Sequence, residues 1–152
     1  MSVDFKIRWA EPKDTEQIHA LIIELAEYEQ AKDQVTLSKD DLLRDGFGEE
    51  PRFKCLVAER EENILGMALI YERYSTWKGP TLYLEDLIVK SSERRRGVPS
   101  ALMNELIGYS KSKGYMRLEW QVLDWNEDAI EFYKKHGAEF DNEWLNCRIV
   151  PR

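Results

Sequence analysis

The sequence has few of the residues that build disulfide frameworks and zinc sites. Its two cysteines, Cys55 and Cys147, lie inside apolar runs and not at paired or metal-ligand spacing. Its two histidines, His19 and His136, are too far from cysteine to form a metal cluster with it. These absences exclude a disulfide framework and argue against a zinc site, although ligation by carboxylates alone stays open. We therefore expect no bound metal.

Long apolar runs and an excess of positive charge are also missing. No window approaches the about 18 uninterrupted apolar residues of a membrane helix, and the start of the chain lacks the apolar core of a signal peptide. The chain has 22 basic and 29 acidic side chains, so its formal net charge is −7. Duplex nucleic acids are bound through many Lys and Arg contacts to phosphate, which an acidic chain does not favour. We expect a cytoplasmic protein that binds neither membranes nor nucleic acid and suits basic partners.

The chain shows no internal repeat, no low-complexity segment and no Pro/Gly/Ser-rich linker. Its 152 residues, of which 43% are hydrophobic, are the usual size for one hydrophobic core. We therefore expect a single domain over residues 1–152.

Hydrophobic periodicity predicts six strands and four helices. Alternating apolar residues favour strands, and apolar residues three or four positions apart favour amphipathic helices. The polar stretch 61–63 between two apolar runs predicts a hairpin. The order of elements implies an α/β fold with a mixed sheet, helices on both faces and a parallel crossover between residues 81–89 and 116–122. The expected strands are 5–9, 53–59, 64–74, 81–89, 116–122 and 144–150, and the expected helices are 14–29, 38–45, 98–111 and 129–136.

The most informative segment, residues 84–102, is an apolar strand followed by a basic loop that contains glycine and then by the start of a helix. The loop carries three consecutive arginines, Arg94 to Arg96, ahead of Gly97. Backbone N–H groups at a helix start point outward unpaired, and with nearby arginines they form a site for phosphate. The alternative interpretation is a solvated turn ahead of an ordinary helix, which is the usual role of a charge run by itself.

The chain resembles the GNAT superfamily of N-acetyltransferases, whose acetyl-CoA loop reads R/Q-x-x-G-x-G/A. Residues 94–99 match this pattern except at Pro99, where the family has Gly or Ala. Within the superfamily, the chain is similar over nearly its whole length to the spermidine/spermine and thialysine N-acetyltransferases. Several stretches in the same order are more specific than one glycine loop. They are residues 25–29, 45–48, 55–59, 83–86 and 122–126.

The resemblance implies a fold, a cosubstrate and an oligomeric state. The fold is a central mixed, mostly antiparallel, twisted sheet of about six to seven strands flanked by about four helices. The cosubstrate is acetyl-CoA, and the family forms homodimers. Proline has no N–H group, so Pro99 removes one potential phosphate donor. The residues implied for acetyl-CoA are Leu87, Ile88, Val89, Arg94, Arg95, Arg96, Gly97, Val98, Pro99, Ser100, Asn126, Ala129 and Tyr133.

The resemblance also assigns the two proton transfers of acetyl transfer to an amine. A lysine-like ammonium has a pKa of about 10.4 and must lose a proton before it attacks. Glu85 is the implied base, acting directly or through water, and Tyr133 the implied acid for the departing thiolate. Without the resemblance, the pattern along the chain indicates that Glu85 is an outward-facing carboxylate on a strand and that Tyr133 is an aromatic residue of the core. The residues implied around the acceptor are Tyr28, Glu29, Glu85, Glu119, Trp120, Gln121 and Trp144.

Three function classes stay open at this point. The first is a small-molecule N-acetyltransferase acting on the primary amine of a thialysine- or lysine-like amino acid or of a di- or polyamine, by direct attack in a ternary complex. Ser75 stands where the polyamine-acetylating branch carries an acid, which favours the shorter acceptors. The second is a protein or peptide N-acetyltransferase. The third is a non-catalytic CoA- or amine-binding module, which Pro99 would permit.

Overall fold

The structure is a computed structural model that describes residues 4–151. The chain divides into two compact units, Met1–Trp120 and Gln121–Arg152, which we describe one at a time. The single domain expected over residues 1–152 stays a prediction. The first unit contains β1 (Lys6–Trp9), α1 (Thr15–Tyr28), α2 (Lys39–Phe47), β2 (Lys54–Arg60), β3 (Asn63–Ser75), β4 (Gly79–Val89), α3 (Val98–Lys113) and β5 (Leu118–Glu119), and the second unit contains α4 (Glu127–Lys135).

The first unit is built on one mixed sheet with the strand order β1-β2-β3-β4-β5. β1, β2, β3 and β4 pair in an antiparallel manner, and β4 pairs with β5 in parallel. The hairpin expected around residues 61–63 joins β2 to β3, where Glu61 and Glu62 have positive φ angles of 50° and 69°. The mixed, mostly antiparallel sheet and its parallel crossover are therefore confirmed.

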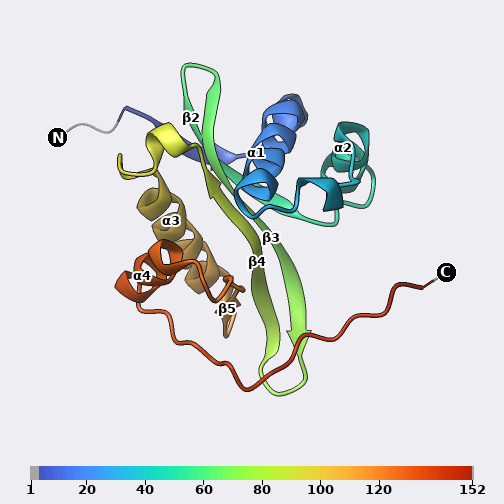
Figure 1. Cartoon of the computed structure of the whole chain (residues 1–152), viewed down its shortest axis with the longest axis vertical. Helices are drawn as coiled ribbons and strands as arrows, with labels where there is room; N and C mark the ends of the chain where they lie inside the picture. The colour runs from blue at the N-terminus through green and yellow to red at the C-terminus, as the bar shows by residue number, and fades with distance from the viewer. Residues whose placement is uncertain (1–3, 152) are drawn as a thin grey trace. The chain divides into compact units, whose positions relative to one another are not determined.

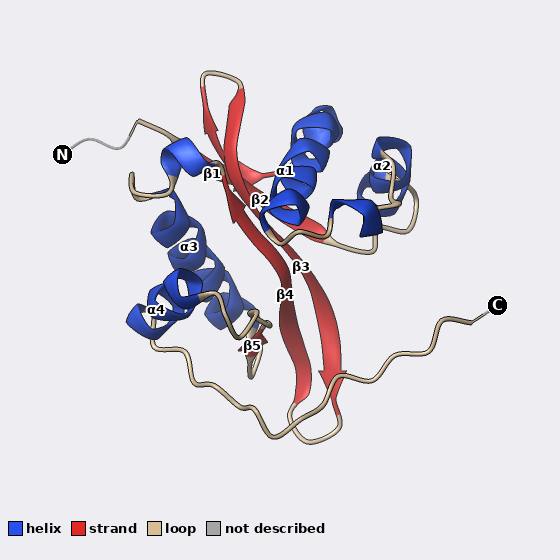
Figure 2. Cartoon of the chain, in the orientation of Figure 1, coloured by secondary structure: helices blue, strands red, loops and turns tan. Residues whose placement is uncertain are grey.

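Helices cover both faces of this sheet (Figures 1 and 2). On one face, Ile18 and Leu21 of α1 and Leu42 of α2 pack in a cluster with buried side chains of β2, β3 and β4. On the other face lies α3, whose Leu102 and Leu106 are 0% exposed. β2 and β3 are buried along most of their length because both of their faces are covered.

The strand count is lower than predicted, five among the described residues instead of six to seven. The prediction of a strand over 144–150 is wrong, because this segment has no regular structure in the part of the chain that is described. Its apolar composition favours a strand, but a strand also needs a neighbouring edge and a buried face. Leu145 and Ile149 are both 88% exposed, so the segment has no buried face. β5 is also shorter than the expected 116–122.

Local sequence signals set where the helices begin and end. Ser38 accepts a hydrogen bond from the Asp41 N–H and Asp41 accepts one from the Ser38 N–H, a capping box that starts α2. Gly114, with a φ of 77°, ends α3. In the second unit, the Asn126 side chain accepts a hydrogen bond from the Ala129 N–H and so caps α4.

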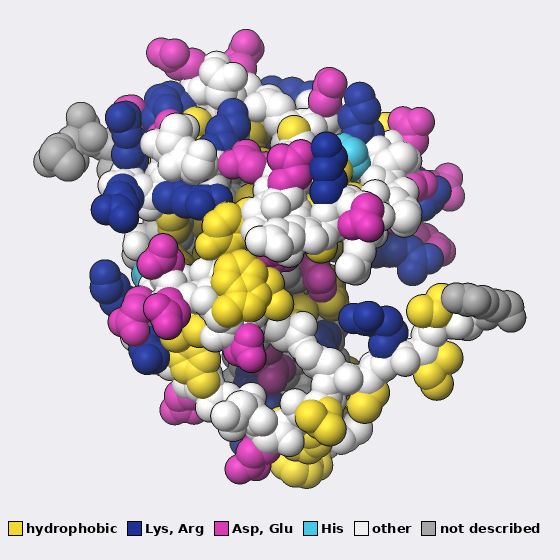
Figure 3. All heavy atoms as spheres, in the orientation of Figure 1, with side chains coloured by type: hydrophobic (Ala, Val, Ile, Leu, Met, Phe, Trp, Pro, Cys, Tyr) yellow, Lys and Arg dark blue, Asp and Glu magenta, His cyan; other side chains and the backbone are white. Residues whose placement is uncertain are grey.

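Acidic and basic side chains are interspersed on the face of the molecule drawn in Figure 3.

Candidate active site

A β-bulge in β4 displays the predicted base, Glu85. Leu69 of β3 pairs with Asp86 and Ile70 pairs with Leu84, so Glu85 has no residue opposite it. A bulge re-aims the side chain of its extra residue, and here Glu85 is exposed on the sheet. The Tyr71 hydroxyl donates a hydrogen bond of 2.7 Å to Glu85 Oε1. The strand carboxylate that the resemblance selects is therefore oriented by a neighbouring phenol.

Two more carboxyl groups, those of Asp86 and Glu29, belong to the same part of the structure, and Asp86 is repelled by both Glu85 and Glu29. Asp86 is mostly buried, and this burial, with repulsion from Glu85 and Glu29, raises its pKa to about 7. Burial also raises the pKa of Glu29, which follows the last residue of α1. We call Glu29, Glu85 and Asp86 the acidic cluster. An ammonium placed there would relieve the repulsion between these groups and favour their charged forms.

Aromatic and cationic side chains extend from the acidic cluster along β3 and β4. The rings of Tyr71 and Tyr83 lie 5.5 Å apart, centroid to centroid. The Arg73 guanidinium lies over the Tyr83 ring at 4.7 Å from its centroid. Burial, followed by the hydrogen bond to Glu85, raises the pKa of Tyr71 to about 12. The sequence analysis missed Tyr71, Tyr83 and Arg73, although polar residues two positions apart in a strand share one face.

The basic loop begins at the end of β4 and leads into α3. β5 pairs with β4 only at Leu82 and Tyr83, so no described strand covers the outer edge of β4 beyond that point. The Arg94 side chain donates from Nε to the Val89 carbonyl at 3.3 Å, and its guanidinium lies 5.4 Å from the Tyr28 ring centroid. Leu87, Ile88 and Val89 are thus on a stretch whose outer edge can offer main-chain groups to a ligand.

The residues of this loop fit the pyrophosphate group that the resemblance implies. Gly97 has a φ of 85° and precedes the first helical residue, Val98, and a Cβ added at Gly97 would meet no atom within 4 Å. The loop therefore leaves open space at a helix start, beside the exposed Arg95 and Arg96. Pro99 is the second residue of α3 and offers no N–H there.

A buried ion pair anchors the turn that precedes the loop. Arg60 of β2 donates to both carboxylate oxygens of Glu93, at 3.1 and 2.8 Å. Glu93 is 6% exposed, and the hydrogen bonds from Arg60 hold its pKa below the usual range. The pair ties the turn Ser91–Glu93 to the sheet at the residue before Arg94. Sequence reasoning missed this pair, because no pattern along the chain links residues 33 positions apart.

The remaining predicted residues fall in β5 and in the second unit. Glu119 pairs with Tyr83 in the sheet, and Trp120 follows it. In the second unit, Tyr133 lies in α4 and is 9% exposed, and its ring contacts Phe132. Gln121 donates to Asn146 at 2.7 Å, and the Trp144 indole donates to Asp141 at 3.0 Å. The predicted base, Glu85, belongs to the first unit and the predicted acid, Tyr133, to the second.

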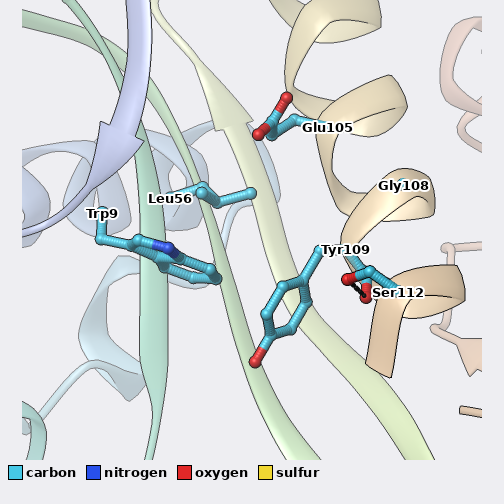
Figure 4. A pocket seen from close by; sticks show the side chains of 6 residues that line it. All are labelled: Trp9, Leu56, Glu105, Gly108, Tyr109 and Ser112. Carbon is cyan, nitrogen blue, oxygen red and sulfur yellow. Dashed lines mark hydrogen bonds between the residues drawn. The ribbon is translucent and has the colours of Figure 1, made fainter. Parts of the chain in front are cut away.

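A separate hollow of about 290 Å³ lies between β1, β2 and α3 (Figure 4). Its aromatic walls are Trp9 and Tyr109, whose rings meet edge to face at 5.0 Å. The Lys54 ammonium lies within 6 Å of both ring centroids. None of the residues expected at the active site lines this hollow.

Two further findings concern metals and membranes. Within residues 4–151, no group of three or more His, Cys, Asp and Glu side chains could hold a metal ion. None of the helices in that range combines the length and apolar character needed to cross a bilayer.

The two cysteines differ in exposure. Cys55 is buried, which raises the pKa of its thiol, and Cys147 is exposed.

The strand–loop–helix arrangement fits a site for the pyrophosphate of an acyl-CoA donor, and comparison with known proteins identifies the family of the chain. The model of the acetyltransferase (GNAT) family matches residues 15–138, so the chain belongs to that family and is an acetyltransferase. Bovine thialysine N-epsilon-acetyltransferase (Bos taurus) is 43% identical over 141 residues, covering 88% of this chain and 83% of that protein.

Two further similarities widen the comparison. Human spermidine/spermine N(1)-acetyltransferase-like protein 1 (Homo sapiens) is 36% identical over 88% of this chain and 20% of its own length. Among solved structures, an integron cassette protein from the mobile metagenome of V. cholerae superimposes with a TM-score of 0.80 at 26% identity, covering 99% of this chain and 94% of that one. These relatives confirm the resemblance to the thialysine and spermidine/spermine branch and the fold expected from it.

Proposed function

We propose that the chain acetylates the side-chain amine of a lysine-like amino acid, with acetyl-CoA as the acetyl donor. The observation that carries the proposal is the acidic cluster beside the Tyr71–Glu85 hydrogen bond. Carboxylates and aromatic faces attract an ammonium through charge and cation–π effects. Similarity to a thialysine N-epsilon-acetyltransferase over 88% of the chain supports the same class of acceptor.

The acidic cluster has two tasks in the proposed reaction. It holds the acceptor as an ammonium, and Glu85 then receives the proton that the amine must lose, through a bridging water. The water relays the proton where the amine and the carboxylate are not in direct contact. Tyr71 keeps Glu85 in place by its hydrogen bond. The amine that results attacks directly, with donor and acceptor bound together.

The cofactor site supports the donor half of the proposal. Bound acetyl-CoA supplies a thioester whose carbonyl carbon is open to attack by an amine. Arg94, Arg95, Arg96 and the backbone around Gly97 would hold its pyrophosphate. The hydroxyl of Tyr133 would give its proton to the sulfur as the carbon–sulfur bond breaks. Asn126 and Ala129 would act by capping the helix that carries Tyr133.

A polyamine is the alternative acceptor, favoured by the similarity to a spermidine/spermine acetyltransferase-like protein. A long polyamine needs a second anionic anchor far from the first. Ser75, at the end of β3, accepts hydrogen bonds from the N–H groups of Trp77 and Lys78 and so serves the β3–β4 turn. Neither the hydroxyl of Ser75 nor the cationic Arg73 on the same strand can anchor an ammonium by charge.

The proposal also includes a homodimer and a cytoplasmic location. A homodimer is supported by exposed apolar side chains near the end of the chain. Trp144 is 77% exposed and Leu145 is 88% exposed, and a second copy could cover them. A cytoplasmic location stays a prediction from composition.

The test is product analysis with acetyl-CoA and four amines: thialysine, lysine, putrescine and spermidine. We expect acetylated thialysine and lysine, and a Glu85→Gln variant that loses about 100-fold or more in kcat/KM. Glu49→Gln is the matched control, because Glu49 is exposed and lies in the loop after α2. Spermidine as the best acceptor would contradict the choice of substrate. Binding of acetyl-CoA with no product from any amine would select the non-catalytic module instead.

A further inference from the structure

Arg73 is the one guanidinium on the strand face that carries the candidate base. Tyr71 and Arg73 are two positions apart on β3, and Tyr83, opposite Tyr71, lies on the same face. Glu85 joins this face through its hydrogen bond from Tyr71. One continuous surface therefore runs from Arg73 over the two phenols to the carboxylates, and we call it the bipolar face.

The Arg73 guanidinium is held in place but keeps its hydrogen-bonding capacity. Its central carbon lies over the Tyr83 ring, 4.7 Å from the ring centroid. Among residues 4–151, no carboxylate comes within 4.0 Å of it, whereas the arginines at positions 8, 44 and 60 each have an acidic partner. A guanidinium that is held by a cation–π contact and has no protein carboxylate within 4.0 Å is suited to bind the carboxylate of a ligand.

The length of the bipolar face can be compared with the length of an acceptor. Arg73 and Glu85 lie on opposite sides of the Tyr71–Tyr83 pair. Two residue steps on each side, at about 3.4 Å per residue, put their backbones about 13 Å apart along the strands. An extended lysine spans about 7 Å from side-chain nitrogen to carboxylate. It is shorter than the backbone separation, and the remaining length is covered by the Arg73 and Glu85 side chains, which reach Tyr83 and Tyr71 from either side.

We propose that Arg73 is a specificity-determining residue that binds the α-carboxylate of an amino-acid acceptor while the acidic cluster holds the side-chain ammonium. This inference rests on the proposed acetyl transfer and adds the reason why an amino acid is preferred to a diamine. Both acceptors carry a second ammonium, but only the amino acid carries a carboxylate beside it, so in a diamine this ammonium stands alone opposite Arg73. Arg73 would repel that ammonium, so the same side chain attracts one class of acceptor and disfavours the other.

Two pairs of amines isolate the carboxylate, because cadaverine is lysine without its carboxylate and putrescine is ornithine without it. We would measure KM and kcat for each, and the dissociation constant of lysine and cadaverine by calorimetry. The variants are Arg73→Gln, which removes the charge, and Arg73→Lys, which keeps the charge but not the fork. Lys78→Gln is the control, because it removes one positive charge from the exposed turn of the same hairpin.

For Arg73→Gln we expect the KM and the dissociation constant for lysine to rise about tenfold or more, with a smaller change in kcat. The KM for cadaverine should fall, since a repelling charge is gone. Arg73→Lys should retain part of the preference for lysine, and Lys78→Gln should retain all of it. Equal losses for lysine and cadaverine in Arg73→Gln, or no loss for either, would overturn the inference.

Binding and turnover separate this inference from the proposed function. If the wild-type chain binds lysine more tightly than cadaverine through Arg73 but acetylates neither, the proposed function fails and the role of Arg73 stands. If the chain acetylates both equally well with and without Arg73, the proposed function stands and the role of Arg73 fails. If it binds neither amine, both are wrong.

Discussion

Ionisation of Asp86 should make the fold less stable as the pH rises from about 4 to about 7. Burial and the neighbouring Glu85 and Glu29 raise its pKa to about 7, from an ordinary value of 3.8. Between these two values the folded chain keeps a proton that the unfolded chain has lost, so the free energy of unfolding falls as the pH rises. Below about pH 4 both states are protonated, and above about pH 7 both are ionised.

The size of this effect follows from the change in pKa. Each tenfold change in an ionisation constant is worth about 1.4 kcal/mol. The rise for Asp86 therefore corresponds to about 4 kcal/mol, and the partial exposure of its side chain reduces this to about 2 to 4 kcal/mol. An Asp86→Asn variant has no carboxylate to ionise, so above pH 7 it should be more stable than the wild type by about this amount. Near pH 4 the two should have about equal stability.

Urea denaturation of both proteins between pH 4 and pH 8.5 measures the difference directly. Titrating groups distant from Asp86 affect both proteins alike, so the difference between the two curves reports the ionisation of Asp86 and its repulsion with Glu85 and Glu29. Glu49→Gln, an exposed substitution of the same kind, should follow the wild-type curve at all pH values. A pH-independent difference, or an Asp86→Asn variant that is less stable than the wild type at pH 8, would refute the reasoning.

Three further predictions concern the loop and the sheet. Arg60→Ala leaves the Glu93 carboxylate without its ion-pair partner and should lower the free energy of unfolding in chemical denaturation. Part of the loss should be recovered when Glu93 is also changed to Ala, and an equal loss in the double variant would argue against the pair. Pro99→Ala restores an N–H at the helix start and should tighten acetyl-CoA binding up to about tenfold. The tighter binding would appear as a larger thermal shift with acetyl-CoA. An unchanged shift would show that this N–H is not a phosphate donor. Gly66→Ala places a Cβ 2.9 Å from the side chain of Val89 and should lower the free energy of unfolding by about 1 to 3 kcal/mol, measured by thermal unfolding. An unchanged free energy of unfolding would mean that β4 moves aside freely.

Local patterns in the sequence predicted the elements of the first unit well. The expected strand 64–74 is β3 (Asn63–Ser75), and the expected strand 81–89 is β4 (Gly79–Val89). Residues 64–70 of β3 and much of β4 are buried, so the apolar composition of these segments directly indicates buried strands. The strand expected at 144–150 failed for the opposite reason. Its apolar residues indicate a propensity for strand, but a segment with this propensity forms a strand only where the edge of a sheet is available to pair with it.

The candidate site was predictable only where one short segment carries it. The resemblance selected Glu85 and the loop around Gly97, because those residues lie within a continuous motif. It did not reveal the pairing of Arg73 with Tyr83, which depends on the register between β3 and β4. It also did not reveal the raised pKa of Asp86, because burial and the approach of Glu29 are set by tertiary packing.

The central claim is that the chain moves an acetyl group from acetyl-CoA to the side-chain amine of an amino acid. The most direct measurement is nuclear magnetic resonance of lysine incubated with the chain and isotopically labelled acetyl-CoA. The account predicts label on the side-chain nitrogen of lysine, with the signal absent when the chain is omitted. Label confined to the α-nitrogen, or no labelled product at all, would contradict it.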